Sequence, residues 1–215
     1  MFRKQHDCLI VATGAFPESE KLLFLLKERI PVIACDGAVN KLMNALIEPD
    51  YIVGDLDSVD ENLQKQLSKK VHFNPDQETN DLTKAAEFAY EKGFRAPLIM
   101  GATGLREDHT LGNISLLIKY RDMFDEVGMI SDYGIFIPIR HTTTFPCKPG
   151  QQISVFALFP YGSITSKGLK YPITERKLPI WWEGTLNETI NDQFTLEIEG
   201  EGNVLVYLRH PFSDK

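Results

Sequence analysis

The chain has 215 residues, of which 43% are hydrophobic and 25% are charged, and 23 basic against 30 acidic side chains give a net charge of −7. These values are typical of a globular protein with one large domain or two small ones. The negative net charge does not favour binding to a nucleic acid. The most apolar segment, residues 22–26, is far too short to span a membrane, and three scattered cysteines indicate neither a disulfide framework nor a zinc site. We therefore expect a cytoplasmic protein with neither a membrane nor a nucleic acid among its partners.

Short apolar runs alternate with helical patterns over roughly the first 140 residues. The spacing of Leu82, Ala85 and Ala89, closed by Gly93, is typical of the helices. Alternation of this kind predicts an N-terminal three-layer α/β domain with a mainly parallel sheet. Its strands are predicted at residues 8–13, 31–35, 51–53, 71–73, 97–100 and 126–130.

After Tyr133 the pattern changes to short alternating segments separated by Gly, Pro and Thr, with no helical spacing. Segments 153–159, 194–198 and 204–208 predict strands of a C-terminal antiparallel β-sandwich. Thr and Pro residues cluster at 141–150, so the predicted domains are 1–140 and 141–215.

Aspartates follow four successive strands of the α/β half, where open parallel sheets bind their ligands. The segments are ACDGAVNKL, GDLDS, DQETNDLTK and GATGLREDHTLGN. In the second segment, Asp55 and Asp57 flank Leu56 directly after a strand, and two like charges so close together favour a metal site over an ordinary turn. Ser58 and Glu61 predict a capping box for the following helix, which gives Ser58 a structural role.

The other polar residues allow two interpretations each. Asp36 precedes a glycine, as turn residues do, and Asp81 suits the first turn of a helix as well as a metal site. Arg106, His109 and Asn113 share one face of a predicted helix, which we interpret as functional because it follows a Gly-Ala-Thr-Gly turn. The core face of that helix is predicted to consist of Leu111, Ile114 and Ile118.

Clustered carboxylates and basic residues indicate chemistry on a polyphosphate. Mg²⁺ binds through one or two carboxylates and substrate phosphates, and phosphoryl-type transfer needs a metal together with Lys or Arg, roles that suit Lys84 and Arg106. Neither a P-loop nor a kinase glycine loop occurs in the sequence. A phosphatase with an aspartate nucleophile and a D-x-D nucleotide-sugar transferase remain as alternatives.

In their order and spacing, the four segments resemble the thiamine pyrophosphokinase family. The resemblance extends to GLKYPI at residues 168–173 and to GTLNE at residues 184–188, where the family has a thiamine-contacting Ser-Asn. It implies an α/β domain followed by a β-sandwich, a homodimer with sites shared between subunits, and transfer of pyrophosphate from ATP to the hydroxyl of thiamine, giving thiamine diphosphate and AMP. Mg²⁺ is the implied cofactor and ATP the co-substrate.

The resemblance also assigns roles to residues at the strand ends. It implies Asp55, Asp57 and Asp81 as the metal ligands, which together with Lys84 and Arg106 form the catalytic set. One of the aspartates is the expected acceptor of the hydroxyl proton. The implied nucleotide or phosphate contacts are Asp36, Gln77, Asp108 and Asn113, with His109 as a supporting or proton-handling residue.

In the second half, the resemblance implies that Tyr171, Thr185 and Asn187 bind thiamine, with the Tyr171 ring facing the cationic thiazolium. The sequence departs from the family pattern at three positions: Asn80 for Thr, Leu105 for Gly, and Leu186 for the serine next to Asn187. Leu186 leaves room for a third alternative, a non-catalytic thiamine-binding module. Trp181 and Trp182 could stack on a ligand or belong to the sandwich core or the dimer interface.

Overall fold

The computed structural model describes residues 6–210, which divide into two compact units between Asp132 and Tyr133. The predicted boundary at residues 140–141 falls inside the second unit. The reason is that strand β7 (Gly134–Ile139) pairs with β13 (Asn203–Arg209) along its whole length.

The first unit contains a parallel sheet in the order β6-β5-β1-β2-β3-β4. Both faces of β1, β2 and β5 are buried, which is why these strands read as unbroken apolar runs such as CLIV and VIAC. All six predicted strands are present, several with ends shifted by a few residues. They are β1 (Cys8–Val11), β2 (Val32–Cys35), β3 (Tyr51–Gly54), β4 (Val71–Phe73), β5 (Pro97–Met100) and β6 (Gly128–Ile130).

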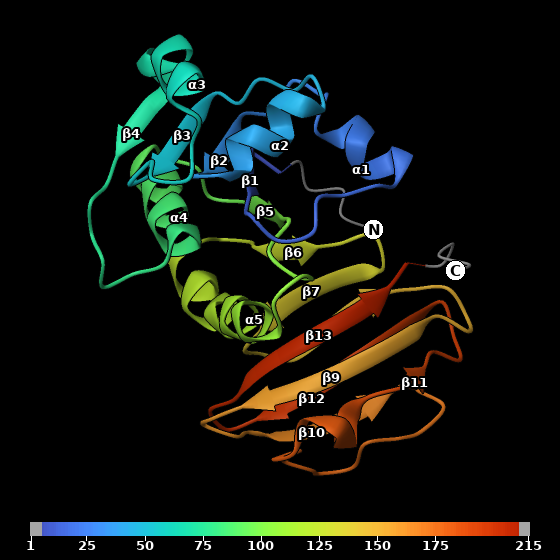
Figure 1. Cartoon of the computed structure of the whole chain (residues 1–215). Coiled ribbons are helices and arrows are strands. Elements are labelled where there is room, and N and C mark those ends of the chain that lie inside the picture. Colours follow the sequence, from blue (N-terminus) through green and yellow to red (C-terminus); the bar gives the residue numbers. More distant parts are fainter. Residues whose placement is uncertain (1–5, 211–215) are drawn as a thin grey trace. The chain divides into compact units, whose positions relative to one another are not determined.

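Helices connect these strands, and Figure 1 shows α1 and α2 on one face of the sheet and α4 and α5 on the other. The chain runs from β1 outward to β4 and then returns to β5 on the opposite side of β1, so the loops after β1 and β5 diverge at a topological switch point. The helices are α1 (Glu20–Leu25), α2 (Ala38–Asn44), α3 (Glu61–Gln66), α4 (Asp81–Glu91) and α5 (Glu107–Met123), with a 3₁₀ turn at Ser68–Lys70.

Two local predictions were wrong. The N-cap of α3 is Asp60, whose Oδ1 accepts the backbone N–H groups of Asn62 and Leu63, and Ser58 lies outside the helix. An aspartate directly before the helix caps it as well as a serine does, so the more distant Ser58 is not needed.

The second error concerns α5, whose buried residues are Leu117 and Tyr120. Leu111, assigned to the core face, is 54% exposed. Asn113 lies on the same face as Leu117 and Tyr120 and is half-buried, so it faces the rest of the α/β unit, contrary to what hydrophobicity alone predicts. Arg106 and His109, at the start of the stripe, are exposed.

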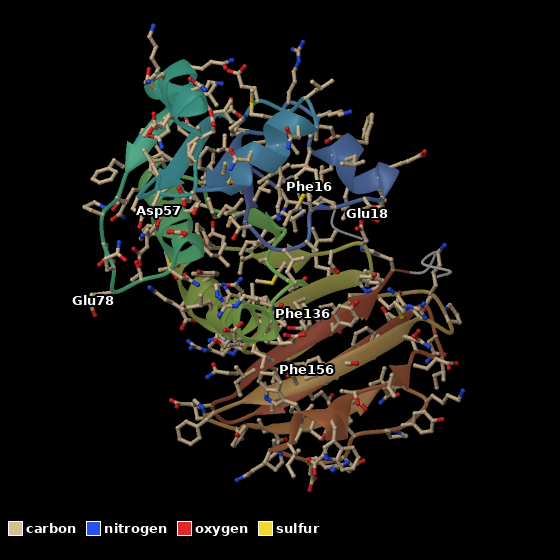
Figure 2. The ribbon with its side chains drawn as sticks, in the orientation of Figure 1. Phe16, Glu18, Asp57, Glu78, Phe136 and Phe156 are labelled. Atoms are coloured by element: carbon tan, nitrogen blue, oxygen red, sulfur yellow. The ribbon has the colours of Figure 1, made fainter. Side chains whose placement is uncertain are left out.

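The second unit consists of two antiparallel sheets, ordered β11-β9-β13-β7 and β10-β12-β8. Within the second of these sheets, Phe145 and Phe194 are cross-strand partners whose stacked rings have centroids 5.0 Å apart. Phe136 and Phe156, labelled in Figure 2, lie 6.0 Å apart on β7 and β9. The remaining strands are β8 (Thr143–Pro146), β9 (Gln152–Leu158), β10 (Ser163–Lys167), β11 (Asn187–Glu188) and β12 (Gln193–Glu199), with a 3₁₀ turn at Trp181–Gly184. Across residues 6–210, no helix has the length and apolar character needed to cross a bilayer.

Candidate active site

Three carboxylates gather at the carboxyl edge of the parallel sheet. Strands β2 and β3 pair in parallel and place Cys35 opposite Val53, so the segments that follow them are neighbours. One oxygen from each of Asp36, Asp55 and Asp57 lies within 4.8 Å of the others. Figure 2 shows Asp57 beyond the end of β3, beside α4. We call these three residues the carboxylate cluster.

Asp36 is the buried member of the carboxylate cluster, with 2% of its surface exposed. Its Oδ1 is buried and has no hydrogen-bond partner among the described residues. Burial raises the pKa of this carboxyl, the Ser58 side chain opposes this by stabilising the ionised form, and the nearby charges of Asp81, Asp57 and Asp55 raise the pKa further. The close approach of the two strand ends depends on Gly54, because a Cβ there would lie 2.8 Å from the Cβ of Asp36.

Asp55 and Asp57 are more accessible and have protein partners. Gln77 donates a hydrogen bond to Asp55 Oδ2 at 3.0 Å, and this bond is the main reason why the pKa of Asp55 is lowered. The Ser58 hydroxyl donates to Asp57 Oδ1 at 2.8 Å. Leu56, between the two aspartates, has a φ of 68°, a left-handed conformation that bends the chain so that both carboxylates face the same region.

Lys84 brings a buried positive charge to the same edge. Its side chain is 3% exposed, and its Nζ lies 3.1 Å from Asp81 Oδ1 and 3.9 Å from Asp55 Oδ2. A buried ammonium group is costly without anionic partners, and these two carboxylates supply them. Asp81 occupies the first turn of α4, as one of its two interpretations expects, and its Oδ1 accepts a hydrogen bond from Lys84 Nζ.

The grouping differs from the expected metal set in one residue. Asp55 and Asp57 lie together as expected, but the third carboxylate within 4.8 Å is Asp36, and among the described residues Asp81 does not join this group. Sequence analysis gave Asp36 only a turn or nucleotide role. The signal that could have found Asp36 was its position directly after β2, because β2 pairs with β3, the strand that precedes Asp55 and Asp57.

The loop after β5 brings Arg106 to the same edge of the sheet. Arg106 precedes α5 and binds Asp108 through two hydrogen bonds, of 3.1 Å to Oδ1 and 2.5 Å to Oδ2. The guanidinium lowers the pKa of Asp108 to about 2. His109 donates its backbone N–H to Asp108, and its side chain is exposed. Leu105 has a φ of 64°, the left-handed conformation that favours glycine, which explains why glycine is usual at this position.

The residues proposed for thiamine all lie in the second unit. Tyr171 is 60% exposed, and the Asn187 side chain holds its backbone by accepting from the N–H and donating to the C=O. Thr185 donates its hydroxyl to Trp182 O. Leu186 is 80% exposed at a φ of 57°. Of the two tryptophans, Trp181 packs edge-on against Phe156 of the sheet, whereas Trp182 is exposed.

Two family models match the chain. The model described as the thiamin pyrophosphokinase catalytic domain matches residues 23–128, and the one described as the thiamin pyrophosphokinase substrate-binding domain matches residues 134–207. A thiamine pyrophosphokinase of Bacillus subtilis is 36% identical over 149 residues, which make up 66% of this chain and 69% of that protein. The chain belongs to the thiamin pyrophosphokinase family.

Other thiamin pyrophosphokinases are similar over different shares of the chain. Thiamin pyrophosphokinase 1 of Caenorhabditis elegans is 33% identical over 116 residues, which make up 50% of this chain and 47% of that protein, so the matched region spans about half the length of that relative. The crystal structure of the Bacillus subtilis thiamine pyrophosphokinase superposes with a TM-score of 0.79 at 23% identity, covering 95% of this chain and 100% of that one. These comparisons confirm the predicted fold class, a mainly parallel α/β domain followed by antiparallel sheets.

Proposed function

We propose that the chain transfers pyrophosphate from ATP to the hydroxyl of thiamine. In this reaction the hydroxyl oxygen bonds to the β-phosphorus, the bond between that phosphorus and the AMP oxygen breaks, and the hydroxyl proton passes to a carboxylate. The observation that carries the proposal is the carboxylate cluster beside the buried Lys84, in a chain of this family.

The carboxylate cluster fits a hard divalent cation, and Mg²⁺ is the ion we propose. Three carboxylate oxygens within 4.8 Å of one another form a donor set that such ions prefer. The buried, unpartnered Oδ1 of Asp36 favours the same ion, because a buried anion without a partner is costly. When bound, Mg²⁺ neutralises charge on the polyphosphate. We propose that Asp36, Asp55 and Asp57 hold it, with Asp81 available at the edge of the site.

Basic and amide side chains orient the reacting groups in this proposal. Lys84 fixes Asp55 and Asp81 relative to each other and offers its remaining donor capacity to phosphate oxygens. Gln77 holds Asp55 from the other side. Arg106 is exposed and can exchange its partner Asp108 for a phosphate, because guanidinium binds both anions with two parallel hydrogen bonds. His109 and Asp108 follow Arg106 and complete the nucleotide side of the site.

Thiamine recognition is assigned to the second unit. The exposed Tyr171 ring supplies a face for the cationic thiazolium, and Asn187 supports that ring by holding the Tyr171 backbone. Thr185 retains acceptor capacity on its hydroxyl oxygen while donating to Trp182. The match of residues 134–207 to a substrate-binding domain supports this assignment.

The test is an endpoint assay of the purified chain with ATP, Mg²⁺ and thiamine, in which nucleotides are separated by chromatography. The expected products are AMP and thiamine diphosphate in equal amounts, with no AMP when thiamine is omitted. Release of ADP or phosphate would contradict the proposed reaction. Turnover of a nucleotide sugar without thiamine would favour the D-x-D transferase, and thiamine binding without turnover would favour a binding module.

We also propose a homodimer and a cytoplasmic location. Exposed apolar side chains in the second unit, namely Ile180, Trp182 and Leu186, support an interface there. The three cysteines are free, which suits a reducing compartment. Sedimentation velocity should give a mass of about two chains, and a species of one chain at micromolar concentration would contradict the dimer.

A further inference from the structure

An amide pair joins helices α4 and α5 at the end nearest the carboxylate cluster. The side chain of Asn80 caps α4 by accepting the N–H of Thr83 at 2.9 Å, and its Nδ2 donates to Asn113 Oδ1 at 3.1 Å. In turn, Asn113 Nδ2 donates to the carbonyl of Ala102 at 2.8 Å. Each amide therefore uses its oxygen and its nitrogen on protein partners, which leaves Asn113 better suited to hold the protein than to bind nucleotide.

The two ends of this chain of hydrogen bonds lie next to catalytic candidates. Asn80 directly precedes Asp81 at the start of α4. Ala102 belongs to the loop of residues 101–106, which leads from β5 to Arg106. The same loop is held from the other side by the segment after β1. There, Gly14 N–H donates to Gly101 O at 2.6 Å and Ala15 N–H to Thr103 O at 2.8 Å.

We propose that Asn80 is a positioning residue that, through Asn113, fixes the loop carrying Arg106 relative to Asp81 and Lys84. The inference rests on the proposed function, because it concerns the alignment of groups assigned there to the polyphosphate. Asn80 stands at a position where threonine is common in the family, and a threonine can cap the helix but has no amide nitrogen to offer Asn113.

Helix capping alone is the competing explanation, and one substitution separates the two roles. In Asn80→Ser the hydroxyl still accepts the N–H of Thr83, because serine and asparagine are about equally good N-caps. The shorter side chain has no amide nitrogen, so the bond to Asn113 is lost. The start of α4 thereby stays intact while its link to the loop is broken.

Contacts further along the same helices provide a matched control. The hydroxyls of Thr83 and Tyr120 form a buried pair at 2.9 Å, and Lys119 binds Glu87 at 2.9 Å on the surface. Neither contact reaches the loop of residues 101–106. The double variant Thr83→Val/Tyr120→Phe therefore loosens the same helix pair without touching the link through Asn113.

The experiment measures AMP formation and thermal unfolding for the wild type, Asn80→Ser, Asn113→Ala, their double variant and the control. We expect Asn80→Ser to lower kcat roughly tenfold while the KM values for ATP and thiamine change less than about threefold, because misalignment affects the transition state more than substrate binding. The double variant Asn80→Ser/Asn113→Ala should be no slower than Asn113→Ala alone, because both substitutions break the same chain of hydrogen bonds. The control should lower the melting temperature and leave kcat within about threefold.

Each other outcome has a defined meaning. A wild-type rate in Asn80→Ser, additive losses in the double variant, or an equal loss of kcat in the control would overturn the positioning role while the wild type still makes AMP. A wild type that makes no AMP would instead overturn the proposed function, and the positioning role with it.

Discussion

The carboxyl edge of the α/β unit and the 168–190 segment of the second unit treat their polar groups in opposite ways. At the carboxyl edge, charges lie close together and the protein leaves part of their demand unmet, as for the buried Oδ1 of Asp36. In the 168–190 segment, Asn187 and Thr185 use their polar groups on the backbone, and the exposed side chains include aromatic and aliphatic ones, such as Trp182 and Leu186, beside charged ones, such as Lys170 and Arg176. The contrast is consistent with the proposed function, in which the first region binds the charged polyphosphate and the second binds thiamine.

The largest effect is expected from removing one charge of the carboxylate cluster. Asp55→Asn keeps the shape of the side chain and should lower turnover roughly 10²- to 10³-fold, since it weakens both the donor set for a cation and the pairing with Lys84. Circular dichroism should show an intact fold. The control is Asp60→Asn, which removes a nearby exposed carboxylate and leaves the α3 cap in place, because asparagine caps equally well. Comparable losses in both variants would contradict a special role for the carboxylate cluster.

A smaller effect, of a different kind, is expected in the second unit. Tyr171→Ala removes the exposed ring and should raise the KM for thiamine roughly tenfold while kcat and the KM for ATP change little, because a cation–π contact contributes to binding. Tyr171→Phe keeps the ring face and should stay within about threefold of the wild type. A loss confined to kcat would remove the distinction between a chemical and a recognition region.

The sequence pointed to candidate residues more directly at the carboxyl edge than in the second unit, for a physical reason. Asp55 and Asp57 stood out as candidates because they come directly after the buried strand β3, where open parallel sheets place their ligands. The proximity of Asp36 to Asp55 and Asp57 was not predicted because it depends on sheet order, since β2 and β3 are neighbours and their ends meet. That adjacency is a long-range property, which no local pattern contains.

The errors on α3 and α5 have the same origin. A capping box at Ser58 was a plausible local pattern, but Asp60 lies closer to the first turn. On α5, hydrophobicity favoured a core face with Leu111, whereas the hydrogen bond from Asn113 to Ala102 and the one between the hydroxyls of Tyr120 and Thr83 orient the helix the other way. Buried polar pairs of this kind decide a helix face, and they become visible only when both partners are placed.

The unmet charge of Asp36 predicts a dependence of stability on pH and on divalent cations. Its pKa in the folded protein lies above the ordinary value of 3.8, so the native state binds more protons than the unfolded one, and the free energy of unfolding falls as pH rises through that window. With chelator at pH 8, Asp36→Asn should therefore be more stable than the wild type by about 1 kcal/mol. Added Mg²⁺ should raise the melting temperature of the wild type more than that of the variant. Equal shifts in both proteins would contradict the proposed cation site.

The smallest expected effect tests whether the pH dependence of stability arises from the carboxyl edge alone. His72 packs against the rings of Tyr51 and Phe88, at centroid distances of 5.6 and 4.4 Å, and burial together with Lys92 lowers its pKa. In the unfolded chain His72 has its ordinary pKa of 6.5, so below that pH the unfolded chain binds more protons than the folded protein. The free energy of unfolding therefore decreases as pH falls, whereas the Asp36 contribution decreases as pH rises. His72→Phe keeps the ring contacts and should be more stable than the wild type at pH 5.5, by less than about 1 kcal/mol, with little difference at pH 8. Urea unfolding at the two pH values measures the two differences, and a difference that grows toward alkaline pH would contradict the role given to His72.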